Sequence, residues 1–584
     1  MAGTAVDSLM AGVAGATTGI GVGAPIYGGS LSIGVTSDAP KVKTFTGQTG
    51  KLDAAGYCVA AACYDLMFIM NKAGTAVLPF LALSAVGSNT YKSWTVTLRQ
   101  GVKFHSGAIF NADAVVANFQ AAKADLTVGQ ALANVVDSCT KVSTYVVKYT
   151  THFSYFTFPF ILATSQIAFM ADPVMFAPTP SNPGTYTYNG LPQGTGAFKC
   201  NSWNLNTSSS WSKNTTYWRQ DALGHALPYL STLTFKVIPD AATRLSALQS
   251  ASIDIGVFFD GVTQKQIKNG VSAGGNPAVY LSDLNSVYRD PAMNCIMCNV
   301  TGKDLTGATG SQDPSGSWVP GPAAPTSDIR IRSAMSNAIN RTAYLTGIDQ
   351  GQGATSDGPF RTSSPFYAAH GYPAGGTPAN ITAARSAVNS YKSSHGIASG
   401  TPVTVHMQIV SGSSTAANQF TFIKNALTPV GINLVAVPLL QSVLIGNAIY
   451  KRYECTGWAQ FGGASPDLNY VWWTAFQLSG HGTYFSGFVN FANNVDAVLE
   501  NAMLAAMATS SLATRKTKWK TVNTQLTHDL PYIWLDTTVS MWAANSHVQN
   551  WAYGSAPSVT SVKSATPCLN PDGGAMGWSS IWIN

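Results

Sequence analysis

Charged side chains are scarce in this chain of 584 residues. Lysine, arginine, aspartate and glutamate make up 10% of the sequence, against about 25% in an average soluble domain. The 33 basic and 26 acidic residues give a net charge of +7. No dense lysine or arginine run gathers this charge, so nucleic-acid binding is not indicated. With 46% hydrophobic residues, the chain can bury large cores, and neutral polar groups must provide most of its hydration.

Long hydrophobic runs are also absent. No stretch reaches the roughly 18 consecutive apolar residues of a membrane-spanning helix, and the apolar stretch at residues 73–87 is interrupted by Pro79. Residues 1–27 are rich in alanine and glycine but lack the basic start and continuous apolar centre of a signal peptide. We interpret them as an N-terminal extension of a processed or trimmed chain, with non-classical export as the alternative.

Common catalytic motifs are missing as well. The sequence contains no G-x-S-x-G, no H-E-x-x-H, no P-loop and no G-x-G-x-x-G. Catalytic groups can be dispersed along a chain, so this absence is weak evidence when taken alone. Together with the features below, it leads us to expect a protein that is not an enzyme and that needs no cofactor.

The most informative segment that is present covers residues 94–119. Its first residues, WTVTLR, alternate between apolar and polar side chains, which predicts a half-buried strand. A glycine-punctuated turn follows, and the segment ends in a pattern typical of a helix that Asn111 or Asp113 can cap. The segment therefore predicts a strand, a turn and a helix in succession.

These residues resemble the signature of the family 5 extracytoplasmic solute-binding proteins, the peptide- and nickel-type receptors of ABC importers. The matching residues are Trp94, Leu98, Arg99, Gly101, Val102, Phe104, His105, Gly107, Asp113, Val115 and Phe119. Other segments that resemble family landmarks follow in the expected order: residues 28–35, Tyr64 to Leu66, Gly194 to Phe198, Asn214 with Tyr217 and Trp218, Pro228 with Tyr229, residues 239–255, Arg332 to Arg341, Pro466 with Asp467, and Arg515 with Pro531. The resemblance covers roughly residues 28 to 552, and its specificity comes from this ordered co-occurrence.

The pattern of short strands alternating with amphipathic helices favours an α/β architecture. The resemblance implies a two-lobed periplasmic-binding-protein-like fold with a hinge and an interlobe cleft. Lobe I would contain residues 28–285 with a C-terminal return at 540–584, and lobe II would contain residues 286–539.

The resemblance also implies a function outside the cytoplasm, in the periplasm or at the cell surface. The protein would close around a small oligomeric solute between its lobes and deliver it to a membrane ABC permease. Oligopeptides are the expected solute. The alternatives are an oligosaccharide or metal-chelate receptor, or a surface structural or assembly protein that reuses the fold. No paired histidine spacing indicates a metal site in the protein itself.

The ligand-binding residues are expected in the segment 455–476. Aromatic side chains here can stack on a solute, and glycines let backbone amides approach it. For the tryptophans, ordinary packing inside the lobe is the competing interpretation. The candidates are Trp458, Gln460, Phe461, Gly462, Tyr470, Trp472 and Trp473.

The same segment departs from the pattern of the family's peptide receptors. Those that resemble this chain usually place an aspartate shortly after a Gly-Trp pair, where it binds the α-ammonium group of the peptide. Here Gly457 and Trp458 are followed by Ala459, Gln460 and Phe461. A buried ammonium group without a charged partner costs on the order of several kcal/mol. A neutral solute or a blocked peptide therefore becomes an alternative to a peptide with a free amino group.

Eight cysteines, an even number, suit the oxidising compartment in which the family works. Their spacing does not determine which cysteines pair. The candidate disulfides are Cys58 with Cys63, Cys139 with Cys200, and Cys295 with Cys298, with Cys455 and Cys568 as further possible partners. Cys295 and Cys298 form a C-x-x-C that also occurs in zinc sites, but no second pair of ligands lies near it in sequence.

Overall fold

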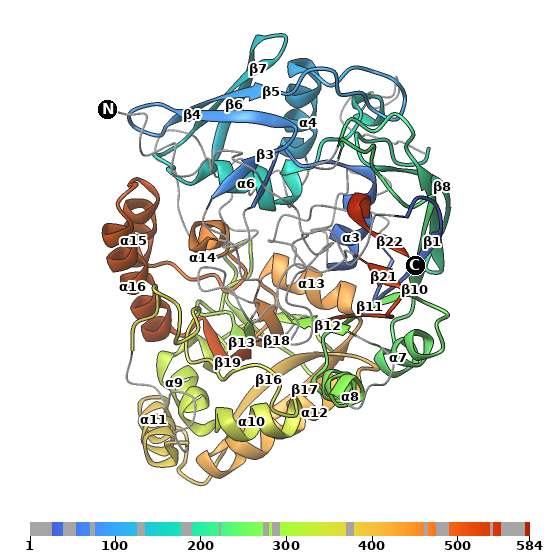
Figure 1. The fold of residues 1–584 in the computed structure, drawn as a ribbon. Helices are drawn as coiled ribbons and strands as arrows, with labels where there is room; N and C mark the ends of the chain where they lie inside the picture. Colours follow the sequence, from blue (N-terminus) through green and yellow to red (C-terminus); the bar gives the residue numbers. More distant parts are fainter. Residues whose placement is uncertain are drawn as a thin grey trace. The chain divides into compact units, whose positions relative to one another are not determined.

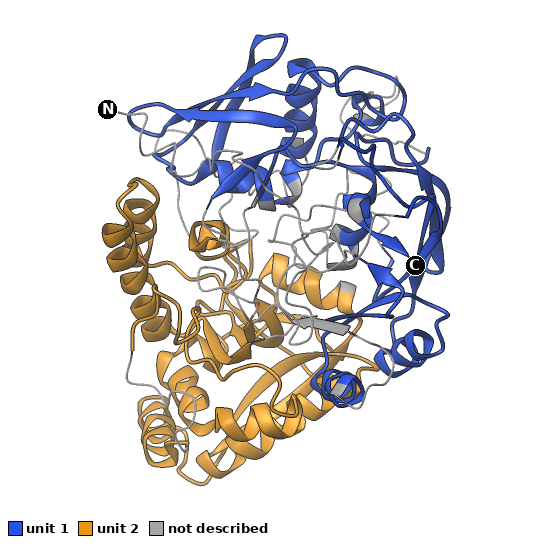
Figure 2. Ribbon diagram, in the orientation of Figure 1, with its two compact units in different colours: residues 1–288, 540–584 blue, residues 289–539 orange. Residues whose placement is uncertain are grey.

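The computed structural model describes residues 26–38, 54–70, 76–124, 135–176, 190–220, 224–272, 279–282, 293–369, 379–460, 465–474, 490–537, 541–549 and 578–583. The chain divides into two compact units (Figure 2). Unit 1 contains residues 1–288 and 540–584, and unit 2 contains residues 289–539. Of the expected N-terminal extension, residues 1–25 lie outside the described residues. Within the described ranges, no helix combines the length and the apolar character needed to cross a membrane.

Unit 1 contains a seven-stranded and a four-stranded sheet with helices beside them (Figure 1). Its helices are α3 (Ala54–Cys63), α4 (Ala112–Ala124), α6 (Phe158–Thr164), α7 (Ala241–Gln249) and α8 (Gly261–Ser272), with the 3-10 helices η1 (Gln166–Ala168), η2 (Pro173–Phe176) and η7 (Trp578–Ser580). The larger sheet has the order β12 (Val279–Ser282), β20 (Met541–Ala544), β11 (Ile255–Phe258), β1 (Ser30–Val35), β10 (Thr232–Val237), β9 (Ser208–Lys213), β8 (Phe198–Asn204). The smaller sheet has the order β4 (Ala82–Gly87), β5 (Ser93–Leu98), β7 (Val146–Thr151), β6 (Val136–Ser143), and two short pairs join β2 (Phe68–Met70) to β3 (Val77–Pro79) and β21 (Val548–Gln549) to β22 (Trp582–Ile583).

The large sheet is completed by a strand from near the end of the chain. β1 pairs in parallel with β10 and β11, as buried strands of an α/β unit do. β20, about 280 residues further along than β11, pairs antiparallel with both β11 and β12. The complete sheet of unit 1 therefore contains strands from both of its chain segments.

The signature segment has the predicted structure. Buried and more exposed residues alternate along β5, and α4 begins at Ala112, directly after Asn111. The Asn111 side chain accepts a hydrogen bond from the backbone N–H of Ala114 at 3.1 Å, which caps the helix. In the turn between them, Gly101 and Gly107 have φ angles of 78° and 95°, which residues with a Cβ rarely adopt. The predicted strand, turn and helix are thus confirmed.

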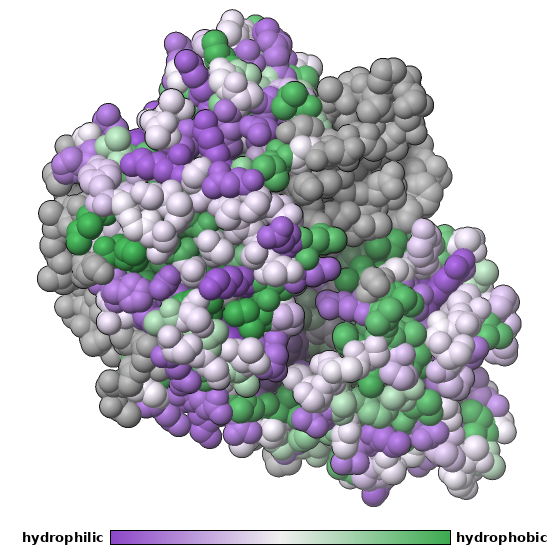
Figure 3. All heavy atoms as spheres, turned by 90° about the vertical axis from the view of Figure 1, so that its right-hand side faces the viewer, coloured by the Kyte–Doolittle hydropathy of each residue, from purple (hydrophilic) through white to green (hydrophobic). Residues whose placement is uncertain are grey.

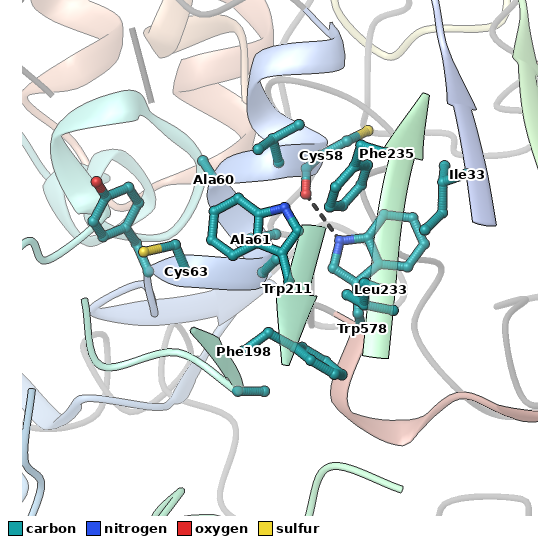
Figure 4. Packing of buried hydrophobic residues seen from close by; sticks show 14 of the residues in the cluster. Ile33, Cys58, Ala60, Ala61, Cys63, Phe198, Trp211, Leu233, Phe235 and Trp578 are labelled. Atoms are coloured by element: carbon teal, nitrogen blue, oxygen red, sulfur yellow. Dashed lines mark hydrogen bonds between the residues drawn. The ribbon is translucent and has the colours of Figure 1, made fainter. Parts of the chain in front are cut away.

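Two tryptophans from distant parts of the chain lie in the main core of unit 1 (Figure 4). Trp211 of β9 and Trp578 of η7 are completely buried. The indole N–H of Trp578 donates to the carbonyl oxygen of Cys58 at 2.9 Å, and its ring packs edge-on against Phe235. The indole is large and apolar with one polar atom, so this single hydrogen bond satisfies it while its area is removed from water. The C-terminal segment is thereby part of this core.

Unit 2 is built around a five-stranded sheet. The sheet has the order β17 (Ile432–Leu439), β16 (Val403–Val410), β18 (Cys455–Gln460), β13 (Met293–Cys298), β19 (Tyr532–Thr537), and a separate pair joins β14 (Gly310–Gln312) to β15 (Trp318–Pro320). The helices are α9 (Ile329–Ala338), α10 (Arg341–Ile348), α11 (Ile381–Ser394), α12 (Ser414–Leu427), α13 (Gln441–Tyr450), α14 (Tyr470–Trp473), α15 (Ala497–Met507) and α16 (Leu512–Asp529), with η4 (Pro325–Ser327), η5 (Thr428–Val430) and η6 (Pro466–Asn469).

One face of this sheet packs against α9, α10, α11 and α12. Side chains from β13, β16, β18 and β19 share a buried cluster with apolar residues of these helices. Capping side chains precede each of the four helices: Asp328, Asn340, Asn380 and Ser413 each accept a hydrogen bond from a backbone N–H of the first turn. We call this side of the sheet the helix face.

The predicted disulfides are not confirmed. No disulfide bond joins two of the seven cysteines within the described residues, and Cys568 lies outside those residues. Cys295 and Cys298 are three residues apart on β13, so their side chains point to opposite faces of the sheet.

The other two predicted pairs meet similar obstacles. Cys58 and Cys63 lie five residues apart on one helix, which places them on different sides of it. Cys139 lies on β6 of the four-stranded sheet and Cys200 on β8 of the seven-stranded sheet. Spacing in the sequence did not reveal these orientations.

The surface agrees with the low charge content. On the face that Figure 3 shows, pale residues of intermediate hydropathy lie among strongly hydrophilic and hydrophobic ones. Since only 10% of the residues are charged, neutral side chains and backbone groups provide much of the hydration, as expected from the composition.

A buried carboxylate connects three segments of unit 1. Asp65, just after α3, is 5% exposed. It accepts hydrogen bonds from Thr195 Oγ1 at 3.0 Å, Tyr217 Oη at 2.9 Å and Trp218 Nε1 at 2.8 Å. Burial raises the pKa of Asp65 to about 6, although these hydrogen bonds and the charge of Arg219 lower it. Each of the three segments matches a landmark of the family signature.

Gly194 and Gly196, on either side of Thr195, have no room for a side chain. A Cβ atom on Gly194 would lie 2.1 Å from the carbonyl oxygen of Cys63, and one on Gly196 would lie 2.5 Å from the same oxygen. The turn is also held by His105, whose Nδ1 accepts from the Gly194 N–H at 3.3 Å and whose Nε2 lies 2.9 Å from the Gly196 carbonyl. Burial lowers the pKa of His105 to about 4, so the ring is neutral and its Nε2–H donates. His105 thus has a structural role.

We expect Asp65→Asn to lower the free energy of unfolding of unit 1 by about 2 kcal/mol at neutral pH. The asparagine side chain has only one acceptor oxygen for the three donors, and its own N–H groups face at least one of those donors. Removing a buried charge offsets part of the resulting loss of stability. Urea unfolding followed by tryptophan fluorescence measures the change. The control is Asp113→Asn, because Asp113 is 62% exposed and pairs with Lys141 at 2.7 Å on the surface; its effect should stay below about 1 kcal/mol. Equal losses in both variants would contradict the anchoring role of Asp65.

Candidate functional site

The face of the unit 2 sheet opposite the helix face carries polar and aromatic side chains. In one row across the sheet, Gln408 of β16 lies beside Thr456 of β18. Thr456 is opposite Met297 of β13, and Met297 is opposite Tyr532 of β19. Residues paired across neighbouring strands point to the same face. These four side chains therefore share one side of the sheet.

The next rows of the same face continue this character. Trp458 is opposite Cys295, and Cys295 is opposite Trp534. Gln460, two residues after Trp458, is opposite Met293, two residues before Cys295. We define the polar-aromatic face by five of these side chains: Gln408, Trp458, Gln460, Tyr532 and Trp534.

The polar atoms of this face are buried without internal hydrogen bonds. Gln408 is 0% exposed and Gln460 is 2% exposed. Among the described residues, no partner is found for either side-chain amide atom of Gln408, for Gln460 Nε2, for the indole N–H of Trp458 or Trp534, or for Tyr532 Oη. Buried polar groups in folded proteins are nearly always hydrogen-bonded, and an unsatisfied one costs about 1 to 3 kcal/mol. These atoms therefore have a capacity for hydrogen bonds that the described residues leave unused.

Two tryptophans of the predicted site remain partly accessible. Trp458 and Trp472 are both half-buried, and both pack against Phe491, with ring centroids 5.4 and 5.7 Å from it. Packing against a shared ring holds each indole in place while part of its surface can contact a solute. The structure thus brings Trp458, Gln460 and Trp472 to one region of unit 2.

Tyr470 and Trp473 lie in the interior of the unit instead. Tyr470 is 1% exposed, and its hydroxyl donates to Glu500 of α15 at 3.0 Å. Trp473 is 2% exposed and packs against Phe360 and Trp519. These contacts give both side chains a packing role, which was the competing interpretation for Trp473. Phe461 and Gly462, the remaining predicted residues, lie outside the described residues.

An ion pair inside unit 2 positions the segment that carries Trp472. Asp467 of η6 accepts hydrogen bonds from Arg515 Nη2 at 2.7 Å and Trp519 Nε1 at 2.9 Å. The Asp467 side chain is 0% exposed and that of Arg515 is 6% exposed. Because a buried charge needs both its partner and its hydrogen bonds, this arrangement tolerates little movement of η6 relative to α16. The Pro-Asp landmark of the sequence is therefore a structural anchor.

Two further acidic groups lie on or next to strands of this sheet. Glu454, just before β18, accepts from His406 Nδ1 at 3.0 Å and from the His406 backbone N–H at 2.9 Å. The hydrogen bond to Glu454 raises the pKa of His406. Asp536 of β19 accepts from Asn294 Nδ2 at 2.7 Å. Burial and the neighbouring Asp349 carboxyl raise the pKa of Asp536 to about 9, so Asp536 is neutral at neutral pH.

Sequence reasoning did not identify Gln408, Tyr532 and Trp534 as candidates. They lie on β16 and β19, far in sequence from the aromatic segment, and only the sheet order brings them beside β18. The sequence did contain a pattern that could have identified them: polar or aromatic residues recur at every second position in residues 403–410 (VTVHMQIV) and 532–537 (YIWLDT). Across the described part of the chain, no group of three or more His, Cys, Asp or Glu side chains is arranged to hold a metal ion.

The comparisons with known proteins agree on one family. The model described as "Bacterial extracellular solute-binding proteins, family 5 Middle" matches residues 76–481. The nickel-binding periplasmic protein of Escherichia coli (strain K12) is 26% identical over 302 residues, which is 51% of this chain and 50% of that protein. Glutathione-binding protein GsiB of Salmonella typhi is 32% identical over 206 residues, 34% of this chain and 37% of that protein. The chain thus spans about half or less of the length of these two curated relatives.

A solved structure extends the similarity over nearly the whole chain. The oligopeptide-binding protein AppA of Bacillus subtilis, solved in complex with a nonapeptide, has a TM-score of 0.69 and 17% identity, and the match covers 96% of this chain and 100% of that one. At this identity the similarity shows the fold alone. It confirms the expected two-lobed α/β fold.

We expect the free energy of unfolding of unit 2 to fall as pH rises from about 4 to about 9, because Asp536 titrates at a higher pH in the folded than in the unfolded chain. With its pKa raised in the folded protein, Asp536 keeps a proton there that the unfolded chain has released, so unfolding becomes easier at higher pH, by up to about 1.4 kcal/mol per pH unit. Asp536→Asn is neutral at every pH and should lose less stability between pH 5 and pH 8, as measured by urea unfolding at both values. Parallel pH profiles for the variant and the original protein would contradict the raised pKa.

Proposed function

Since the chain belongs to the family 5 bacterial extracellular solute-binding proteins, we propose that it is the receptor of an ABC importer and that it binds oligopeptides or similar amide-bearing solutes. The family consists of extracytoplasmic solute receptors rather than enzymes, and the protein accordingly works outside the cytoplasm. The proposed partner is a membrane permease. A solute signals to such a partner only through its greater affinity for the conformation that the permease recognises.

The polar-aromatic face of unit 2 is the observation that carries the choice of solute. Each glutamine amide has two N–H donors and one acceptor oxygen, which complement the C=O and N–H groups of a peptide backbone. The indole N–H groups and the tyrosine hydroxyl add further donors. None of the five side chains is charged, and the nearby Glu454 is already paired with His406, so the face suits a neutral part of the solute.

An oligosaccharide receptor is the second candidate. The half-buried indoles of Trp458 and Trp472, each packed against Phe491, offer flat apolar surfaces on which sugar rings can stack. The buried amides would then bind hydroxyl groups. The nickel-binding relative also makes a metal chelate a possible solute.

Native mass spectrometry of the purified protein, before and after mild denaturation, tests the proposal directly. A set of co-purified peptides supports the main proposal. A co-purified sugar or metal chelate would instead assign the protein to one of the other solute classes. A protein that carries no solute and self-associates at micromolar concentration would favour a structural role and contradict the receptor function.

We expect Gln460→Glu to shift preference toward peptides with a free amino terminus. The original protein should bind an N-acetylated peptide at least as tightly as the same peptide unblocked. A carboxylate at position 460 would gain a charged partner in the unblocked peptide, and a gain of about 1.4 kcal/mol would raise its relative affinity tenfold. Isothermal titration calorimetry with both peptides measures the ratio.

The matched control is Gln441→Glu, which adds the same charge at an exposed position of α13. This variant should leave the ratio of the two affinities unchanged. If Gln460→Glu behaved like this control, the polar-aromatic face would not be where the peptide terminus binds.

A further inference from the structure

Two cysteines of unit 2 lie directly opposite each other on neighbouring strands. Cys298 is the last residue of β13, and Cys455 is the first residue of β18. The antiparallel register pairs them. Both are 0% exposed and both belong to the cluster on the helix face. Their side chains therefore point to the same side of the sheet.

The hydrogen bonds around this pair identify its geometry. The backbone N–H of Asn299 donates to the carbonyl oxygen of Glu454 at 3.0 Å. Because hydrogen-bonded and non-hydrogen-bonded pairs alternate along an antiparallel ladder, Cys298 and Cys455 form a non-hydrogen-bonded pair. In such pairs the Cα atoms are about 4.5 Å apart and the side chains are closest. This separation lies at the short end of the range of about 4.4 to 6.8 Å found for disulfides.

The two thiols also interact in the folded protein. Burial raises the pKa of Cys455 well above its usual value, and a hydrogen bond with Cys298 adds to the effect. A buried thiol with a raised pKa is a poor nucleophile and is shielded from reagents. Any reaction between the two cysteines must therefore take place before β13 and β18 are enclosed by the helices.

We propose that Cys298 and Cys455 form a cross-strand disulfide while the chain folds outside the cytoplasm. The oxidant is an external disulfide, either a thiol–disulfide oxidoreductase or a small-molecule disulfide. One cysteine thiolate attacks the external disulfide and releases one external thiol, and the second cysteine then attacks the mixed disulfide and releases the other. The two cysteines lose two hydrogens in total, and the external disulfide is reduced to two thiols. The inference relies on the extracytoplasmic location in the proposed function, not on the identity of the solute.

Cys295 provides an internal comparison on the same strand. It lies on the polar-aromatic face, and its Sγ is 3.5 Å from the carbonyl oxygen of Trp458. Residues three apart on a strand face opposite sides, so Cys295 cannot replace Cys298 in the pair. This difference predicts a specific linkage among the buried cysteines of unit 2.

The linkage would protect the register of β18. Trp458 and Gln460 lie on the polar-aromatic face only as long as β18 keeps its present pairing with β13. A shift by one residue would turn both side chains to the helix face. A covalent bond at the first residue of β18 excludes that shift.

The test is to reduce and unfold the full chain, refold it with or without a mixture of oxidised and reduced glutathione, and then denature it with iodoacetamide present. Peptide mass spectrometry should find, only in the oxidised sample, a peptide pair joined through Cys298 and Cys455 that is about 2 Da lighter than the two thiol peptides together. Cys295→Ala should keep this linkage and Cys455→Ala should abolish it. The oxidised protein should also unfold at a higher urea concentration than the reduced protein.

Alkylation of both cysteines after oxidative refolding, or linkage of either one to another cysteine, would overturn the proposal. If Cys455→Ala does not fold, the peptide map of the original protein decides the question alone. The experiment contains no solute, so its outcome is separate from the receptor function. A linked protein that binds no solute would contradict the proposed function, and a binding protein with both thiols reduced would contradict the disulfide.

Discussion

The hydrogen bonds that Asp65 accepts are the constraint on which unit 1 depends most visibly. Its buried carboxylate joins the end of α3 to Thr195 and to Tyr217 and Trp218. A carboxylate without donors could not remain buried there, because its desolvation would cost several kcal/mol. The three segments must therefore meet, and the close contact of the glycine turn with Cys63 leaves little freedom in how they meet. Short motifs far apart in the sequence thus describe one physical site.

Unit 2 uses the same device for its candidate segment. Asp467, buried against Arg515 and Trp519, holds η6. Glu500 accepts hydrogen bonds from the hydroxyls of Tyr470, the first residue of α14, and of Thr474, directly after its end. The recognisable Pro-Asp landmark is therefore a structural anchor, and the polar-aromatic face proposed to bind the solute consists of other residues. The residues that carry the resemblance to the family and the residues proposed to select the solute are separate sets, so the second set can vary while the fold is retained.

Local patterns predicted local structure well. The alternation in WTVTLR and the capping side chain of Asn111 act over a few residues, so the strand and helix at 94–119 followed from the sequence. Trp473 and Trp458 look alike in sequence, but Trp473 is buried against Trp519 of α16, whereas Trp458 is only half-buried. Gln408 and the opposition of Cys298 and Cys455 depend on sheet order and register, which are set by long-range pairing. No spacing between these residues contains that information.

As the proposed solute-binding surface, the neutral polar-aromatic face would change how a solute is selected. A buried aspartate recognises a single charged group and excludes neutral ligands, because its own charge would remain unpaired. Buried glutamines and indole N–H groups instead penalise any solute that leaves them without hydrogen bonds, at about 1 to 3 kcal/mol for each group. Several such groups discriminate together as strongly as one charge does, but they respond to the pattern of donors and acceptors along the solute. A receptor of this kind selects the backbone or hydroxyl pattern of a polymer in preference to its charged end.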